Sequence, residues 1–452
     1  MHYAIRLISS KHRLIMALVL AMVLLDTLSF RVAMFSDEHS LLTTLFIFVS
    51  AMLGLGQLLV LFFVVDKNKI QGIHYHLDVI QRVAPIIQYA LAVIIVIVIL
   101  QIILTTYYST VLLTISVGLS YTTGAFMIAL LAHKFVTWFK SNRRGVVLLY
   151  GISFGVLFIN IALALSLTIN LLLAAPPQIW PHYGVLTPIG SGIRAGTLTD
   201  ILNQAYVVSS IASFATMWLA TALLLHSYSL RIGRVRYWIF LGSPLIFFLS
   251  QFVTVIFNAF DPLIQSDPVF FSFFFTILFS LTKPAGGILF GIAFWAIAKN
   301  ILNRPILKDR ILISAWAFVF LFISSQANTL FSNPFPPFGL ATISLLSLSS
   351  YLLLTGIYSA AIAISEDAKL RTEIRKSVLH DSRFLESISR AQLEQEMQNR
   401  VAAIIREHKI DKMVKEEHQA LVESSLDDDA AKRYLMEIME EFLAKKEKIN
   451  RG

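Results

Sequence analysis

The sequence predicts an all-α, polytopic membrane protein with about ten transmembrane helices and a C-terminal cytoplasmic helical tail. The chain of 452 residues is 56% hydrophobic and only 14% charged, whereas soluble domains are about 45–50% apolar and about 25% charged. Its apolar residues form blocks long enough to cross a bilayer, which takes roughly twenty helical residues. The composition changes abruptly after residue 364, so we expect a transmembrane domain over 1–364 and a charged cytoplasmic tail over 365–452.

Ten apolar segments account for the transmembrane domain. Their centres lie near Met22, Leu53, Ile95, Thr122, Phe158, Thr216, Phe247, Pro284, Val319 and Leu352. The first segment follows a short basic stretch and resembles a signal peptide, but no small-residue cleavage site follows it. We therefore expect it to be retained as the first span.

The loop charges predict the orientation, because cytoplasmic loops are enriched in lysine and arginine. Ten spans with a cytoplasmic N-terminus leave only Arg31 and Arg194 in outer loops. The basic residues then expected inside are Arg6, Lys11, Arg13, Lys67, Lys69, Arg82, Lys134, Lys140, Arg143, Arg144, Arg231, Arg234, Arg236, Lys299, Arg304, Lys308 and Arg310. Adding or removing one span would destroy this asymmetry. We predict a multi-pass protein of a cell membrane with both termini cytoplasmic.

The predicted tail differs in charge from the rest of the chain. Residues 365–452 have a net charge of −2 and residues 1–364 a net charge of +11, so the basic balance of the chain belongs to the membrane part. No basic stretch carries the interleaved aromatic residues of a nucleic-acid surface. Within the tail, Leu435, Ile438 and Phe442 recur at helical spacing. We expect a helical module that packs on itself, on the cytoplasmic loops or on a protein partner, and the sequence does not indicate an oligomeric state.

The stretch "SLTKPAGGILF", residues 280–290, places a charge inside the predicted eighth span. Lys283 lies too far from either end of this span for its side chain to reach the interface easily, and a central charge costs about 2.5–3.5 kcal/mol on insertion scales. Pro284 removes a backbone donor, and Gly286 and Gly287 loosen the helix beyond it. We therefore expect a kinked or interrupted span with these three residues as hinge candidates, and Lys283 facing the protein interior.

Asp26 is the acidic residue that could neutralise Lys283, because it is the one carboxylate deep within a predicted span. Counted from the cytoplasmic side, Asp26 lies at about 18 Å and Lys283 at about 22 Å, at 1.5 Å per residue. The pattern predicts a buried pair in which removing one partner is worse than removing both. Gln326 and Asn328, in the polar run "ISSQANTL", are further candidates for binding a substrate or an ion, with helix-to-helix hydrogen bonding as the alternative.

The sequence contains no pattern that indicates catalysis or a cofactor. It has no cysteine, which excludes disulfides and thiolate chemistry. His74, His76 and Asp78 could be metal ligands only on a strand, since histidines two apart diverge on a helix. His380 followed by Asp381 is faintly similar to a kinase phosphoacceptor site, but no glycine-rich ATP-binding region follows it. We expect no metal, no cofactor, no catalytic residue and no enzymatic activity.

Three functions remain open at this point. The leading one is translocation of a small solute or ion, because a broken span at the bilayer midplane is typical of transporter sites. The second is a membrane sensor or assembly subunit that acts through its cytoplasmic tail. The third is a lipid-modifying membrane enzyme, which would need polar catalytic groups near an interface. The partners expected from sequence are the lipid bilayer and a protein that contacts the tail.

Overall fold

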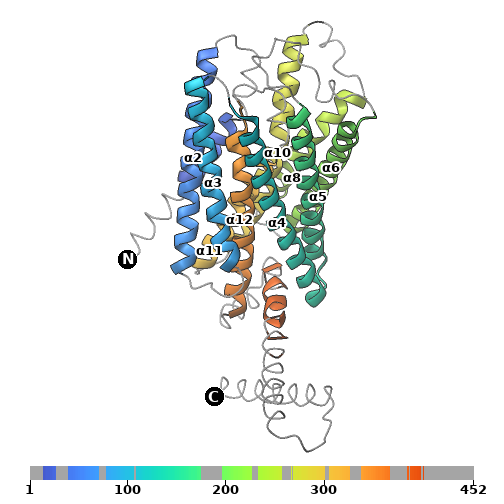
Figure 1. Cartoon of the computed structure of the whole chain (residues 1–452). Coiled ribbons are helices and arrows are strands. Elements are labelled where there is room, and N and C mark those ends of the chain that lie inside the picture. Colours follow the sequence, from blue (N-terminus) through green and yellow to red (C-terminus); the bar gives the residue numbers. More distant parts are fainter. Residues whose placement is uncertain are drawn as a thin grey trace, which may run out of the picture. The chain divides into compact units, whose positions relative to one another are not determined.

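A computed structural model describes residues 14–26, 39–70, 78–105, 108–174, 196–226, 233–256, 266, 268–300, 305–325, 337–366, 384–385, 387–395, 397–398 and 401. This part of the chain is helical, with no strand in it (Figure 1). The labelled helices are α2 (His39–Ile70), α3 (Asp78–Thr105), α4 (Thr110–Asn142), α5 (Gly145–Ala174), α6 (Leu198–His226), α8 (Arg234–Ile256), α10 (Pro268–Asn300), α11 (Pro305–Ser324) and α12 (Leu340–Glu366). The chain divides into two compact units, Met1–Glu394 and Gln395–Gly452, and every contact discussed below lies within the first.

Among the described residues, six helices are long and apolar enough to cross a membrane: α2, α3, α4, α5, α6 and α12. Leu14–Asp26 is a shorter apolar helix. Each of the ten predicted span centres lies in a described helix. The all-helical prediction is confirmed, and the apolar helices indicate a membrane-embedded protein. The count of ten spans stays a prediction.

The outward faces of these helices are apolar. Phe62 on α2 and Ile86 on α3 are 63% and 64% exposed, and Val96 on α3 is also exposed. Monomeric soluble proteins rarely expose contiguous apolar patches larger than a few hundred Å². Such side chains are stable when lipid chains cover them.

α12 lies at the centre of the first unit, although it comes late in the chain (Figure 1). It contacts α2, α3, α4 and α11, and residues 340–361 are all buried. Hydroxyl side chains join it to α4: Ser120 Oγ donates to the carbonyl oxygen of Ile343 at 2.6 Å, and Thr123 Oγ1 donates to Ser347 Oγ at 2.9 Å. Small hydroxyl residues allow helices to approach closely in a membrane and satisfy one another there.

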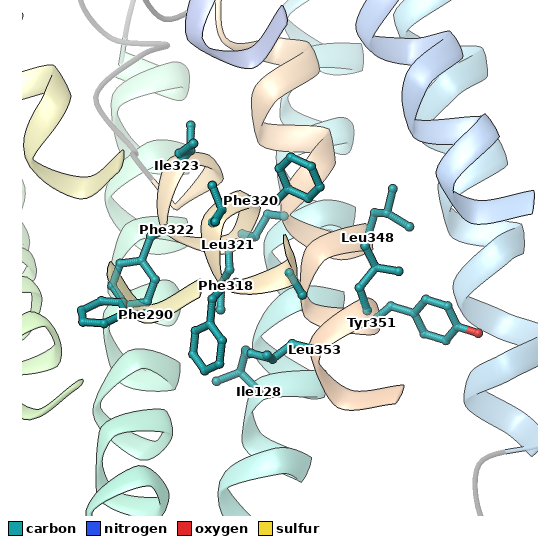
Figure 2. Close-up of a cluster of buried hydrophobic side chains, with 14 of the residues drawn as sticks. Ile128, Phe290, Phe318, Phe320, Leu321, Phe322, Ile323, Leu348, Tyr351 and Leu353 are labelled. Carbon is teal, nitrogen blue, oxygen red and sulfur yellow. The ribbon is translucent and has the colours of Figure 1, made fainter. Parts of the chain in front are cut away.

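Buried aromatic and aliphatic side chains pack together around α10, α11 and α12, as Figure 2 shows. Phe290 of α10 packs edge-on against Phe322 of α11, with 4.7 Å between ring centroids. Phe318, one turn earlier on α11, packs against Phe154 of α5 at 5.9 Å. This packing connects α10 and α5 through α11.

The sequence predicts a kinked or interrupted eighth span. α10 runs as one helix from Pro268 to Asn300, so it is not interrupted, and a kink at Pro284 stays a prediction. Pro284 leaves one helical hydrogen bond unmade, but the helix continues because its other backbone groups remain paired. The glycines serve close packing. A Cβ at Gly287 would lie 3.1 Å from the carbonyl oxygen of Val319, and one at Gly291 would lie 2.7 Å from that of Ala315. These two glycines, four residues apart, let α10 approach the backbone of α11.

Residues 384–385 and 387–394, which belong to the predicted tail, pack against the ends of α4, α5 and α10. The Phe384 ring lies 5.5 Å from that of Tyr150 on α5 and 6.1 Å from that of Phe294 on α10. Trp138 Nε1 on α4 donates to Gln392 Oε1 at 3.1 Å. Buried aromatic contacts of this kind stabilise the attachment of this segment. The division into domains at residue 364 stays a prediction.

Candidate functional site

Lys283 lies halfway along α10 and is partly buried. Its Nζ donates to the Tyr206 hydroxyl of α6 at 2.9 Å and to the carbonyl oxygen of Ser325 at 3.1 Å. The same Nζ lies 5.2 Å from the centroid of the Tyr206 ring, within the range of a cation–π interaction. The prediction that Lys283 faces other helices is therefore confirmed by its contacts with α6 and with the residue that follows α11.

Tyr206 is held in place by α5. Asn160 Nδ2 donates to the carbonyl oxygen of Tyr206 at 3.1 Å and to Ser209 Oγ at 2.9 Å. Ser209 Oγ also donates to the Tyr206 carbonyl oxygen, at 3.0 Å. Tyr206, Ser209 and Ser213 are buried on one side of α6, at positions i, i+3 and i+7. This spacing was the sequence signal for the tyrosine, which our sequence reasoning missed.

A second tyrosine, Tyr121 of α4, is fully buried. Its hydroxyl has no hydrogen-bond partner among the residues that the structure describes. Ser213 Oγ is likewise buried without a partner in the described part. Unpaired buried hydroxyls are uncommon, because each costs about 1–3 kcal/mol.

The partners of Lys283 among the described residues are neutral. The Tyr206 hydroxyl and the Ser325 carbonyl accept hydrogen bonds from two of the three N–H groups of its ammonium group. No carboxylate pairs with it within the described ranges. A central lysine costs about 2.5–3.5 kcal/mol on insertion scales. The hydrogen bonds and the aromatic ring offset part of this cost, but the positive charge itself remains uncompensated there.

Asp26 has a different set of partners at the start of α12. Thr342 Oγ1 donates to Asp26 Oδ2 at 2.5 Å, and the Gly339 N–H donates to Oδ1 at 3.5 Å. A buried carboxylate at this position is stabilised by the unpaired N–H groups and the positive dipole end of the helix. The predicted Lys283–Asp26 pair is therefore wrong for this structure. Equal depth did not bring the two charges together, because Asp26 faces α12 while Lys283 faces α6.

Two glutamines extend the network around Asp26. Gln57 of α2 donates through Nε2 to the carbonyl oxygen of Ala341 at 2.7 Å and accepts from Ser344 Oγ at 2.9 Å. Gln88 of α3 donates to Gln57 Oε1 at 2.6 Å. All these groups are buried. They join α2 and α3 to the first turns of α12, which is a structural role.

The other candidates for a binding site or a hinge lie either outside the described residues or within α10. Gln326 and Asn328 lie outside the described residues, in the segment that follows Ser325. Pro284, Gly286 and Gly287 are buried inside α10, and a Cβ at Gly286 would meet the ring of Phe214 on α6. His74, His76 and His380 also lie outside the described residues. Within the described ranges, no group of three potential metal ligands occurs.

Comparison with family models, with curated proteins and with solved structures found no match. The class of the protein therefore follows from its fold and its buried groups. The described part of the chain is all-helical, with several helices apolar enough to be embedded in a membrane. Its buried polar groups include the Lys283–Tyr206 group and the Asp26–Gln57 network.

Proposed function

We propose that the protein translocates a small solute or ion across a cell membrane, without enzymatic chemistry, and that Lys283 lies at the solute site. The observation that carries this proposal is the ammonium group of Lys283, which is held mid-helix by Tyr206 and the Ser325 carbonyl with no described carboxylate beside it. Charged groups inside membrane bundles mark substrate and ion pathways by default. α10 is continuous, so the proposal no longer depends on a broken helix.

The proposed topology has ten spans, both termini in the cytoplasm and residues 365–452 as a cytoplasmic helical module. It rests on the distribution of lysine and arginine among the loops. A reporter fused after Gly452 should be active in the cytoplasm, and one inserted near Gly190 should be active outside. Equal signals on the same side would contradict this topology.

The absence of cysteine from the chain permits a test that needs no knowledge of the solute. Lys283→Cys introduces a single thiol at the proposed site. A membrane-impermeant thiol reagent is applied to right-side-out and to inverted vesicles, and labelling is followed by mass shift. Thiolates react only where water reaches them, so a translocation site that opens to each side in turn should be labelled in both preparations.

Ile288→Cys is the matched control on the same helix, because Ile288 is 41% exposed on the apolar outer surface. In a bilayer it faces lipid and should remain unlabelled. Failure to label Lys283→Cys from either side, or equal labelling of both variants, would contradict a solute site at Lys283. Labelling from one side only would favour sensing over translocation.

The second candidate function, sensing relayed to the tail, is supported by one specific contact. Phe384 packs against Phe294 of α10, about three helical turns from Lys283. Movement of α10 on ligand binding would therefore reach the segment that leads into the tail. In that case Phe384→Ala would abolish the signal and leave ligand binding at Lys283 intact.

A further inference from the structure

We propose that Lys283 and Tyr206 form a binding site for a small monovalent anion. This inference rests on the proposed function in placing the solute at Lys283, and it adds the chemical class of that solute. The balance of hydrogen-bond donors and acceptors around the lysine, the charge of the group and its burial support an anion.

The group around Lys283 has more donors than acceptors. One N–H of the ammonium group remains after the bonds to Tyr206 and Ser325. The Tyr206 hydroxyl accepts from Lys283, and its own proton has no acceptor in the described part of the chain. A ligand that completes these two bonds must therefore be an acceptor.

The charge of the site favours an anion over a neutral acceptor. Lys283 is the single described ionisable group in this cluster with a positive charge, and it contacts a phenol and a carbonyl oxygen. Asp26 is bound instead by Thr342 and Gly339. One negative charge would neutralise the lysine, and charge-assisted hydrogen bonds from N–H and O–H donors are stronger than neutral ones. A cation would meet repulsion at the same place.

The burial around Lys283 limits the size of the ligand. Tyr206 is 5% exposed. The ring of Phe214 lies against Gly286, about one turn further along α10, with no room for a Cβ. We therefore expect the ligand to be an anion of one to a few atoms, such as a halide, nitrate or a short carboxylate, and not a bulky polyhydroxy acid.

The test is anion-dependent stability of the purified full-length chain in a non-ionic detergent. Sodium gluconate is replaced stepwise by sodium chloride, nitrate or acetate at constant ionic strength, and the unfolding temperature is measured. A ligand present at ten times its Kd stabilises the folded state by about 1.4 kcal/mol, which for a chain of 452 residues should raise Tm by about 1.5 °C. We expect a saturable rise with at least one of the three small anions.

Three variants assign the effect to the site. Lys283→Met should abolish the rise and Lys283→Arg should retain most of it, because the charge is conserved. Lys299→Met is the matched control, since Lys299 lies exposed at the end of the same helix over Trp295, and it should respond like the wild type. If Lys283→Met does not fold, Tyr206→Phe serves instead. It should raise the anion concentration that gives half of the rise in unfolding temperature at least threefold.

The outcomes separate this proposal from the proposed function. An equal response of the wild type and Lys283→Met, or no rise in the wild type with any of the three anions, would overturn the anion site. If Lys283→Cys is still labelled from both sides of the vesicle, translocation stands and the solute is not a small anion. If the anion response depends on Lys283 but labelling occurs from one side only, the anion site stands and translocation fails.

Discussion

Gly291→Ala should destabilise the protein, although alanine is the better helix former. An added Cβ at this position would lie 2.7 Å from the carbonyl oxygen of Ala315 and 2.9 Å from Val319 Cγ2. Carbon–oxygen contacts ordinarily lie at about 3.3 Å or more. α10 would therefore have to move about 0.6 Å away from α11, because the backbone oxygen cannot rotate away as a side chain could.

The magnitude follows from two opposing effects. Overpacking of this kind costs about 1–3 kcal/mol, while replacing glycine by alanine in a helix contributes about 1 kcal/mol of stability. Gly155→Ala on α5 isolates the second effect, because a Cβ there would meet nothing within 4 Å. The difference between the two variants should therefore equal the packing cost alone. A chain of 452 residues shifts by about 1 °C for each kcal/mol, so this cost corresponds to about 1–3 °C in unfolding temperature.

The assay is thermal unfolding of both variants and the wild type in the same non-ionic detergent. We expect Gly155→Ala to unfold at or above the wild-type temperature and Gly291→Ala to unfold below it. The double variant Gly291→Ala and Val319→Ala should recover part of the lost stability, because it removes the close contact between the added Cβ and Val319 Cγ2. Equal unfolding temperatures for Gly291→Ala and Gly155→Ala would refute the close approach of α10 and α11.

The remaining predictions concern the two charges and the segment after α12. Because Lys283 and Asp26 have separate partners, the stability loss of the double variant Lys283→Met and Asp26→Leu should equal the sum of the two single losses to within about 0.5 kcal/mol. A double variant more stable than either single variant would instead indicate a direct pair. Phe384→Ala should cost about 3 kcal/mol through lost aromatic packing, measured by thermal unfolding, and an unchanged stability would mean that the segment does not dock. A chain ending at Glu366 should be less stable than one ending at Gln395, whereas equal stability would place residues 384–394 outside the folded unit.

The sequence predicted the helices well, for a simple physical reason. A bilayer offers no hydrogen bonds to the backbone, so each apolar block of about twenty residues must form a helix wherever it lies. The centres near Leu53, Thr122 and Leu352 are local properties of the chain, and the structure has a helix at each. The neighbours of each helix are not a local property, and the central position of α12 was not predicted.

The candidate site was predicted in part. Lys283 is visible in sequence because a charge inside an apolar block is costly. Tyr206 is marked only by its spacing with Ser209 and Ser213, and Tyr121 is not marked at all, because a tyrosine in a membrane helix can equally lie at an interface or in the interior. Asp26 was correctly singled out as buried and incorrectly paired, since residue counting gives the depth of a side chain but not the direction in which it points.

By itself the sequence determined that the chain is helical and membrane-embedded and that Lys283 and Asp26 lie within apolar helices, because these properties depend on composition and on 1.5 Å per residue. Only the tertiary structure decided that Asp26 binds the first turn of α12 and Lys283 binds Tyr206. It also decided that Gly287, one of the hinge candidates, and Gly291 permit close packing of α10 on α11. The reason is that contacts across a bundle depend on the rotation of each helix about its axis, and packing against neighbouring helices sets that rotation.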